Sequence, residues 1–118
     1  MEKITNKPWG NEELLFQGHG YAVKKICILP NQQTSMHFHK IKHETIMVNK
    51  GILLVYLDDR IQPPKSLKLV AGDSLAINPL QIHQMYAGSE PVVYFEAQTD
   101  HLEDVVRIQD NYGRAVQK

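Results

Sequence analysis

The hydrophobic pattern of this chain consists of short apolar runs separated by turn-forming residues. The stronger runs cover residues 21–29, 45–48, 52–57 and 92–99, and weaker runs cover 66–70 and 75–77. Prolines, glycines and aspartates stand between them, and none of the runs continues with a helical period over the length of a helix. The pattern therefore predicts an all-β domain, an antiparallel sandwich or barrel, in which only the tail from Leu102 onward could carry a short helix.

The run at 92–99 alternates between two faces, and its polar face is a candidate for chemistry. One face carries Tyr94, Glu96 and Gln98, and the other carries Val93, Phe95 and Ala97. The second face is the apolar one. Periodicity alone therefore favours solvent for the polar face, although a wet cavity would also accommodate it.

In the run at 21–29, two adjacent lysines could likewise face either solvent or the interior of the barrel. Lys24 and Lys25 point to opposite sides of a regular strand, so one of them could face the interior. An inward cation would be costly unless it met an anion, and a strand beside solvent would remove this difficulty. The pattern slightly favours the solvent-exposed arrangement.

Histidines supply the most specific chemical signal. His37 and His39 are two residues apart and share a face of an extended strand, and Glu44 opens the next apolar strand, which can lie antiparallel to the first. A second turn, after the short apolar run at 75–77, ends on His83. Three imidazoles and one carboxylate form a ligand set for a divalent metal. We therefore predict one metal ion, with zinc, manganese, iron and nickel all compatible.

Length and charge limit the classes of function. A chain of 118 residues is expected to form one domain, with 1–20 as an amino-terminal arm, 21–99 as the barrel and 100–118 as a tail. Lysine plus arginine equal aspartate plus glutamate at 13 each, so no basic surface for nucleic acid is expected.

The single cysteine, Cys27, sits in an apolar run and is interpreted as a small buried hydrophobe. No run has the length of a signal peptide or membrane span, so the cytoplasm is the expected compartment.

The amino-terminal arm is more apolar than a free arm requires. Trp9 could cover one end of the core or pack in a subunit interface, and sequence does not decide between these. With Leu14, Leu15 and Phe16, it could cover the exposed sheet face or strand edges of a small barrel. On this basis we predict a homodimer.

The spacing of the histidines resembles that of the cupin superfamily. Its first motif has the form G-x5-H-x-H-x(3,4)-E-x6-G, and its second has the form G-x5-P-x-G-x2-H-x3-N. The matching positions here are Asn31, His37, His39, Glu44, Gly51, Gly72, Pro79 and His83. The departures are Asn31 and Gln81 for glycine, Ala87 for asparagine, and one extra residue before Pro79. The resemblance implies a double-stranded β-helix, a jelly-roll barrel, with the four metal ligands retained.

Nearly the whole chain resembles the cupin module of type II mannose-6-phosphate isomerase, which is also the carboxy-terminal domain of bifunctional mannose-1-phosphate guanylyltransferases. The matching segments are 8–10 (Pro-Trp-Gly), 23–25 (Val-Lys-Lys), 96–98 (Glu-Ala-Gln) and the tail from Arg107 to Arg114. The family often runs His-His-His-Arg-x-Glu-His, and this chain lacks that arginine, for which Lys40 or Lys42 could substitute as a point charge. The length leaves no room for a nucleotidyltransferase domain, so guanylyl transfer is not expected.

The resemblance implies a metal-dependent aldose–ketose isomerase that acts on a sugar phosphate. Glu96 is the first candidate for the base that moves the proton, and an inward lysine, Lys24, is the second. The cations available for a phosphate are Lys25, Lys40, Arg107 and Arg114, the last two on the resemblance alone. Two other functions stay open: an Fe(II)-dependent dioxygenase, and a module that binds metal and sugar without turnover.

Overall fold

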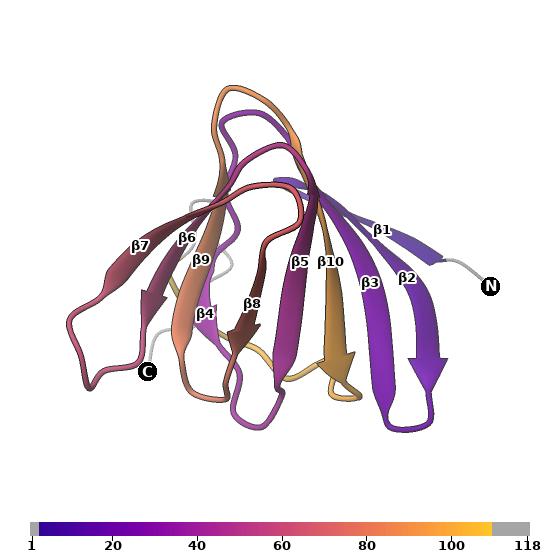
Figure 1. The fold of residues 1–118 in the computed structure, drawn as a ribbon. Coiled ribbons are helices and arrows are strands. Elements are labelled where there is room, and N and C mark those ends of the chain that lie inside the picture. Colours follow the sequence, from indigo (N-terminus) through magenta and orange to yellow (C-terminus); the bar gives the residue numbers. More distant parts are fainter. Residues whose placement is uncertain (1–2, 110–118) are drawn as a thin grey trace.

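The computed structural model describes residues 3–109 and shows two antiparallel β-sheets that face each other (Figure 1). One sheet contains, in spatial order, β1 (Lys3–Lys7), β2 (Gly10–Gly18), β3 (Tyr21–Ile28), β10 (Val92–Thr99), β5 (Glu44–Lys50) and β8 (Ser74–Ile77). The other contains β11 (Val106–Gln109), β4 (Met36–Phe38), β9 (Ile82–Ala87), β6 (Leu53–Asp58) and β7 (Lys65–Leu69). The all-β prediction is confirmed. Among the described residues, no helix is long and apolar enough to cross a membrane.

The core lies between the two sheets and follows from the alternation of the strands. Apolar side chains from β3, β5 and β10 point inward and meet apolar side chains from β6, β8 and β9. The buried apolar residues include Ile26, Ile28, Ile46, Val48, Leu53, Val55, Ile77, Met85, Val92 and Tyr94. Burial of this apolar surface stabilises the barrel and fixes which side of each strand faces the interior.

The amino-terminal segment is part of the first sheet rather than a separate arm. β1 pairs with β2, and β2 pairs with β3 from Gly10 opposite Ile28 to Gly18 opposite Tyr21. Trp9, between β1 and β2, is only 4% exposed and packs in the core, and its carbonyl accepts a 2.9 Å hydrogen bond from the Leu29 amide. Of the two positions predicted for Trp9, the structure shows the one in the chain's own core.

The described part of the tail forms a strand and not a helix. β11 runs antiparallel to β4, with Val106 opposite Phe38 and Arg107 opposite His37. The prediction of a short helix is therefore wrong for residues 106–109, where cross-strand pairing with β4 decides the structure. The remainder of the tail, with Arg114, lies outside the described residues.

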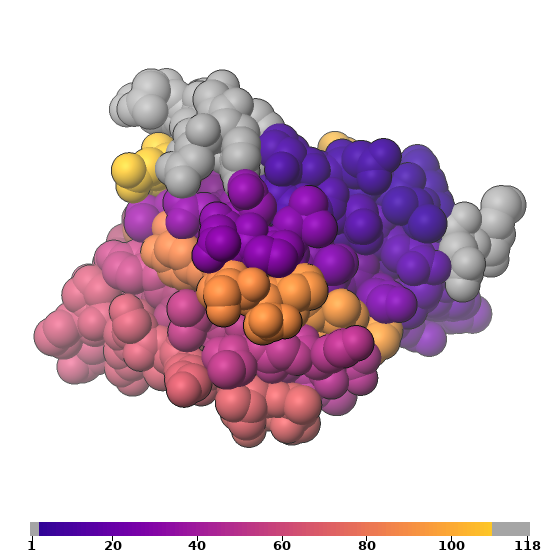
Figure 2. All heavy atoms as spheres, turned by 90° about the horizontal axis from the view of Figure 1, so that it is seen from above, coloured from indigo at the N-terminus to yellow at the C-terminus, as the bar shows by residue number. Residues whose placement is uncertain are grey.

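Turns with left-handed backbone connect the strands. Asn31 adopts φ 60°, as its place in the first motif predicts, and its amide donates a 2.7 Å hydrogen bond to the Gly88 carbonyl. In the second motif the left-handed residue is Leu80, at φ 73°. Leu80 stands three residues before His83, where the motif places its glycine, so the assignment of that position to Gln81 is wrong. Seen from above, the purple segment around residue 31 lies beside the orange segment around residue 88, which the hydrogen bond from Asn31 connects (Figure 2).

Gly51, between β5 and β6, has little space for a side chain. Its φ is +88°, and a Cβ atom built on it would lie 2.5 Å from the carbonyl oxygen of Pro91. Gly20 has nearly the same φ, +85°, but a Cβ there meets nothing within 4 Å. Left-handed strain is thus common to both glycines, whereas the backbone clash is confined to Gly51.

We predict that Gly51→Ala lowers the free energy of unfolding by more than Gly20→Ala does. The matched control should lose about 1–2 kcal/mol from the left-handed conformation alone. Urea unfolding of both variants measures the difference. Equal losses would contradict the role assigned to the close approach of Pro91.

Candidate metal centre

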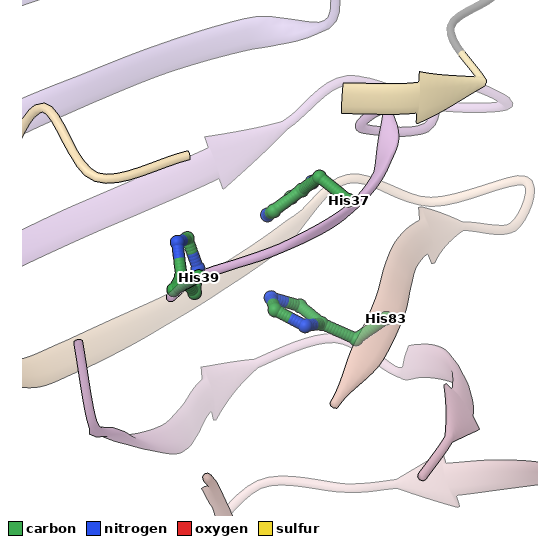
Figure 3. Close-up of side chains that lie close together, drawn as sticks. All are labelled: His37, His39 and His83. Atoms are coloured by element: carbon green, nitrogen blue, oxygen red, sulfur yellow. The ribbon is translucent and has the colours of Figure 1, made fainter. Parts of the chain in front are cut away.

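Three imidazoles converge between the sheets at one end of the barrel (Figure 3). His37 comes from β4, His39 follows that strand, and His83 comes from β9, directly opposite His37 in the ladder. The ring centroids of His37 and His83 are 4.4 Å apart, and those of His39 and His83 are 5.1 Å apart. One nitrogen from each ring lies within 4.8 Å of the other two, so the three can bind a single ion.

A backbone carbonyl sets the orientation of each imidazole. Nδ1 of His37 lies 2.9 Å from the carbonyl oxygen of Ser35, Nδ1 of His83 lies 3.0 Å from that of Gln81, and Nδ1 of His39 contacts that of Asp104. Because a carbonyl oxygen only accepts, each Nδ1 carries the proton and donates it. The Nε2 atoms are then left with free lone pairs, as in protein metal sites whose histidines are oriented by a second group.

Glu44 completes the group at the start of β5. Its side chain is 2% exposed, and its Oε2 lies 3.5 Å from Nε2 of His39 and 3.3 Å from Nε2 of His83. Acceptors that face each other at these distances repel unless a cation lies between them. Nε2 of His39 and Oε1 of Glu44 are also buried without a hydrogen-bond partner among the described residues. This donor set fits a divalent metal ion.

The protonation states agree with a metal centre. Burial, followed by the neighbouring imidazoles His83 and His39, holds the pKa of His37 well below its ordinary value, so the ring is neutral at pH 7. Burial acts to raise the pKa of Glu44, but the imidazoles of His39 and His83 beside it and the charge of Lys42 hold it well below its ordinary value. Neutral imidazole and ionised carboxylate are the forms that bind metal.

The four side chains line a cavity of about 110 Å³ between the sheets. Its apolar wall is formed by Trp9, Ile26, Met85 and Tyr94. Its charged residues, apart from the histidines, are Lys7, Glu12, Lys24, Lys42, Glu44, Glu96 and Arg107. The candidate ligands therefore line the same cavity as several other acidic and basic side chains.

Glu96 faces this cavity, contrary to the preference for solvent that periodicity gave. It is the inner face of β10 that carries Tyr94, Glu96 and Gln98, and the more apolar face of the strand points outward. Oε1 of Glu96 accepts a 3.0 Å hydrogen bond from Nε2 of Gln98, whose Oε1 accepts one of 3.1 Å from Nζ of Lys42. Burial, reinforced by the charge of Glu44, raises the pKa of Glu96 to about 8.

The two adjacent lysines of β3 lie in different environments. Lys24 lines the cavity, and its Nζ lies 2.8 Å from Oε1 of Glu12, which supplies the anion that an inward cation requires. Lys25 is exposed, on the side of the strand opposite to Lys24. The slight preference for solvent was thus wrong for Lys24 and holds for Lys25, which the structure does not bring to the site.

Of the other two predicted substrate-binding residues among the described residues, one lines the cavity and one does not. Arg107 lines the cavity beside His37, because β11 pairs with β4. Lys40 is exposed and does not line the cavity. Lys42 is buried instead, with Nζ 3.7 Å from Oε1 of Glu44, so of the two lysines that could substitute for the family's arginine only Lys42 lies beside a candidate metal ligand. The position of Lys40 gives no support to its predicted role.

Two of the charged residues in the cavity, Lys7 and Glu12, were not predicted from the sequence, and Lys42 was named only as a possible substitute for the family's arginine. Lys42 stands two residues before Glu44, so shared-face spacing could have found it. Lys7 and Glu12 carry no comparable signal. They reach the site because β1 and β2 join the first sheet, and this pairing was not predicted.

A family match described as "Mannose-6-phosphate isomerase C-terminal" extends over residues 1–110. The chain belongs to this family. It is 27% identical over 115 residues to the alginate biosynthesis protein AlgA of Pseudomonas aeruginosa, covering 94% of this chain and 23% of that protein. It is 26% identical over 122 residues to the mannose-1-phosphate guanylyltransferase ManC of Salmonella typhimurium, covering 97% and 24%. The chain thus spans about a quarter of the length of these curated relatives.

Solved structures confirm the predicted fold. The capsular polysaccharide assembling protein CapF of Staphylococcus aureus aligns with a TM-score of 0.81 at 13% identity, covering 92% of this chain and 33% of that one. An oxalate decarboxylase of Lactobacillus farciminis aligns with a TM-score of 0.80 at 16% identity, covering 91% and 33%. At these identities the likeness concerns the fold alone, which is the cupin jelly roll.

We predict that His39→Ala and His83→Ala abolish tight binding of a divalent metal and leave the barrel largely folded. His43→Ala is the matched control, because His43 lies on the same loop but is exposed. Elemental analysis after metal loading and gel filtration gives the occupancy, and circular dichroism checks the fold. Full occupancy in both ligand variants would rule out this assignment.

Proposed function

We propose that this protein is a metal-dependent aldose–ketose isomerase for a sugar phosphate, with mannose 6-phosphate and fructose 6-phosphate as the first substrates to test. The observation that carries the proposal is the position of Glu96. This acid, with a pKa of about 8, lines the same cavity as the group formed by His37, His39, Glu44 and His83. A metal-dependent aldose–ketose isomerase uses both a metal ion and a base with a pKa near the working pH.

The proposed reaction assigns metal binding to four side chains and proton transfer to a fifth. His37, His39, Glu44 and His83 would hold one divalent ion, which when bound supplies a Lewis acid for the carbonyl and adjacent hydroxyl oxygens of the sugar. Glu96 would remove the proton from the carbon beside the carbonyl of the aldose and return it to the former carbonyl carbon, while a proton moves from the oxygen of the first carbon to that of the second. The hydrogen bond from Gln98 occupies Oε1 of Glu96, which leaves Oε2 for this transfer.

Cations that line the same cavity suit a phosphate group. Lys7, Lys24 and Arg107 are available, and Arg107 can bind two phosphate oxygens at once through its planar guanidinium. Lys24 already pairs with Glu12, so a phosphate would have to share this cation. Two relatives that are named mannose-1-phosphate guanylyltransferase support a sugar phosphate as the class of substrate.

Two alternatives are separated from this proposal by direct assays. If the chain binds a sugar phosphate but does not convert it, it is a binding module. If it holds iron and consumes oxygen with an organic substrate, it is an oxygenase, since open positions on Fe(II) also suit oxygen. Metal content, oxygen uptake and NMR of each sugar phosphate distinguish the three.

The predicted homodimer remains a proposal. The burial of Trp9 removes one of its grounds, but Phe16 in β2 is still exposed. Light scattering at micromolar concentration tests it, and a monomeric mass would contradict it.

We predict that Glu96→Gln lowers turnover by roughly 10²–10⁴-fold, as expected for the loss of a general acid–base, while metal binding is retained. The control is Glu90→Gln, which changes an exposed glutamate before β10. NMR of the anomeric and carbonyl signals follows each sugar phosphate with zinc, manganese, nickel or iron supplied. If wild-type protein converts none of them, the isomerase assignment fails.

The raised pKa of Glu96 also predicts a pH dependence of the metal-free protein. In the folded state Glu96 keeps its proton up to a pH of about 8, whereas in the unfolded chain it loses the proton near its ordinary value of 4.5. Between these values the folded state binds more protons, so the contribution of Glu96 to stability is complete below 4.5 and is lost as the pH rises through 8.

Urea unfolding of wild type and Glu96→Gln, with a chelator present, measures this contribution. The stability of wild type relative to Glu96→Gln should fall between pH 5 and pH 9. A constant difference across this range would show that Glu96 titrates normally.

A further inference from the structure

Asp104, which the sequence analysis assigned no role, lies beside the loop that carries the metal ligands. It belongs to the connection between β10 and β11, far along the chain from the loop between β4 and β5. Its backbone carbonyl contacts Nδ1 of His39, and its carboxylate contacts the three residues that follow His39. A single residue therefore contacts this loop through both its backbone and its side chain.

The carboxylate is bound by three successive amides. Oδ1 of Asp104 accepts a 3.0 Å hydrogen bond from the amide of Lys40, and Oδ2 accepts bonds of 2.8 Å from Ile41 and 2.9 Å from Lys42. Desolvation acts to raise the pKa of Asp104, but these three hydrogen bonds hold it below its ordinary value. The carboxylate is thus ionised at neutral pH and its acceptor capacity is directed at one turn of backbone.

This turn connects two candidate ligands. His39 lies immediately before it and Glu44 shortly after it, and Lys42 within it places its ammonium near both Glu44 and Gln98. On the other side, the carbonyl of His39 accepts a 2.7 Å hydrogen bond from the amide of Leu80. Without the carboxylate of Asp104, three amides of the turn would lose their protein acceptor.

We propose that Asp104 is a positioning residue that fixes the 39–42 turn and thereby sets the geometry of His39 and Glu44 for metal binding. The proposal rests on the metal centre described above but not on isomerase turnover. Groups that orient metal ligands typically change metal affinity by 10–100-fold when they are removed.

Asp104→Asn tests the proposal while conserving size and the backbone carbonyl that contacts His39. The amide keeps one oxygen, so it cannot accept all three hydrogen bonds, and its NH₂ group faces backbone donors. Asp100→Asn is the matched control on the same connection, because the carboxylate of Asp100 accepts a 2.8 Å hydrogen bond from Gln17, away from the metal ligands. Zn²⁺ affinity is measured by competition with a chelator.

We expect Asp104→Asn to weaken Zn²⁺ binding by 10–100-fold and Asp100→Asn to leave it within twofold of wild type. In metal-free wild type, the amides of Lys40, Ile41 and Lys42 should be protected from hydrogen exchange, and this protection should be lost in Asp104→Asn. An affinity of Asp104→Asn within twofold of wild type would overturn the proposal, even if its melting temperature were lowered.

Hydrogen exchange in the metal-free protein separates this proposal from the metal centre itself. If wild-type protein bound no Zn²⁺, the metal assignment would fail, and with it the role in metal binding proposed for Asp104. If wild type bound Zn²⁺ but its three amides were unprotected, the metal assignment would stand and Asp104 would not fix the turn. If Asp104→Asn did not fold, Asp104→Glu should restore folding and part of the affinity, and a wild-type affinity in that longer variant would also overturn the proposal.

Discussion

The structure of the site depends on buried lone pairs that face one another. Three backbone carbonyls hold the Nδ1 protons of His37, His39 and His83, and the Nε2 atoms of His39 and His83 face the carboxylate of Glu44. Buried acceptors that face one another repel, and a cation between them would remove the repulsion. The fold supports this arrangement from both sheets, because β4 and β9 carry two of the histidines and β5 carries the glutamate.

The charges around the cavity depend on this group. Glu44 is ionised, and its charge is one reason why the pKa of the buried Glu96 is raised. Lys42 lies between them and interacts with Glu44 directly and with Glu96 through Gln98. A divalent ion would add positive charge at Glu44 and so lower the pKa of Glu96 toward its ordinary value. Occupation of the metal site would thereby make Glu96 a stronger candidate for a base at neutral pH.

Local spacing was enough to predict the fold class and the four candidate ligands, because His37, His39, Glu44 and His83 follow strand periodicity and turn positions. It was not enough for Glu96. Both faces of β10 carry large side chains, and Phe95 on the outer face is only half-buried, so alternation could not identify the interior. Glu12 and Asp104 depend on contacts between distant segments, which no short pattern encodes. The amino-terminal strands were missed for the same reason, since their pairing with β3 is a property of the assembled sheet.

The metal content and coordination of the wild-type protein test the assignment of the metal centre most directly. Elemental analysis after loading should find one divalent ion per chain. If the ion is zinc, this assignment also predicts an X-ray absorption spectrum with imidazole nitrogens and a carboxylate oxygen at about 2.0–2.2 Å. Absence of a stoichiometric ion after separate incubation with zinc, manganese, nickel and Fe(II) would contradict it. A bound ion whose spectrum lacked imidazole ligands would contradict it equally.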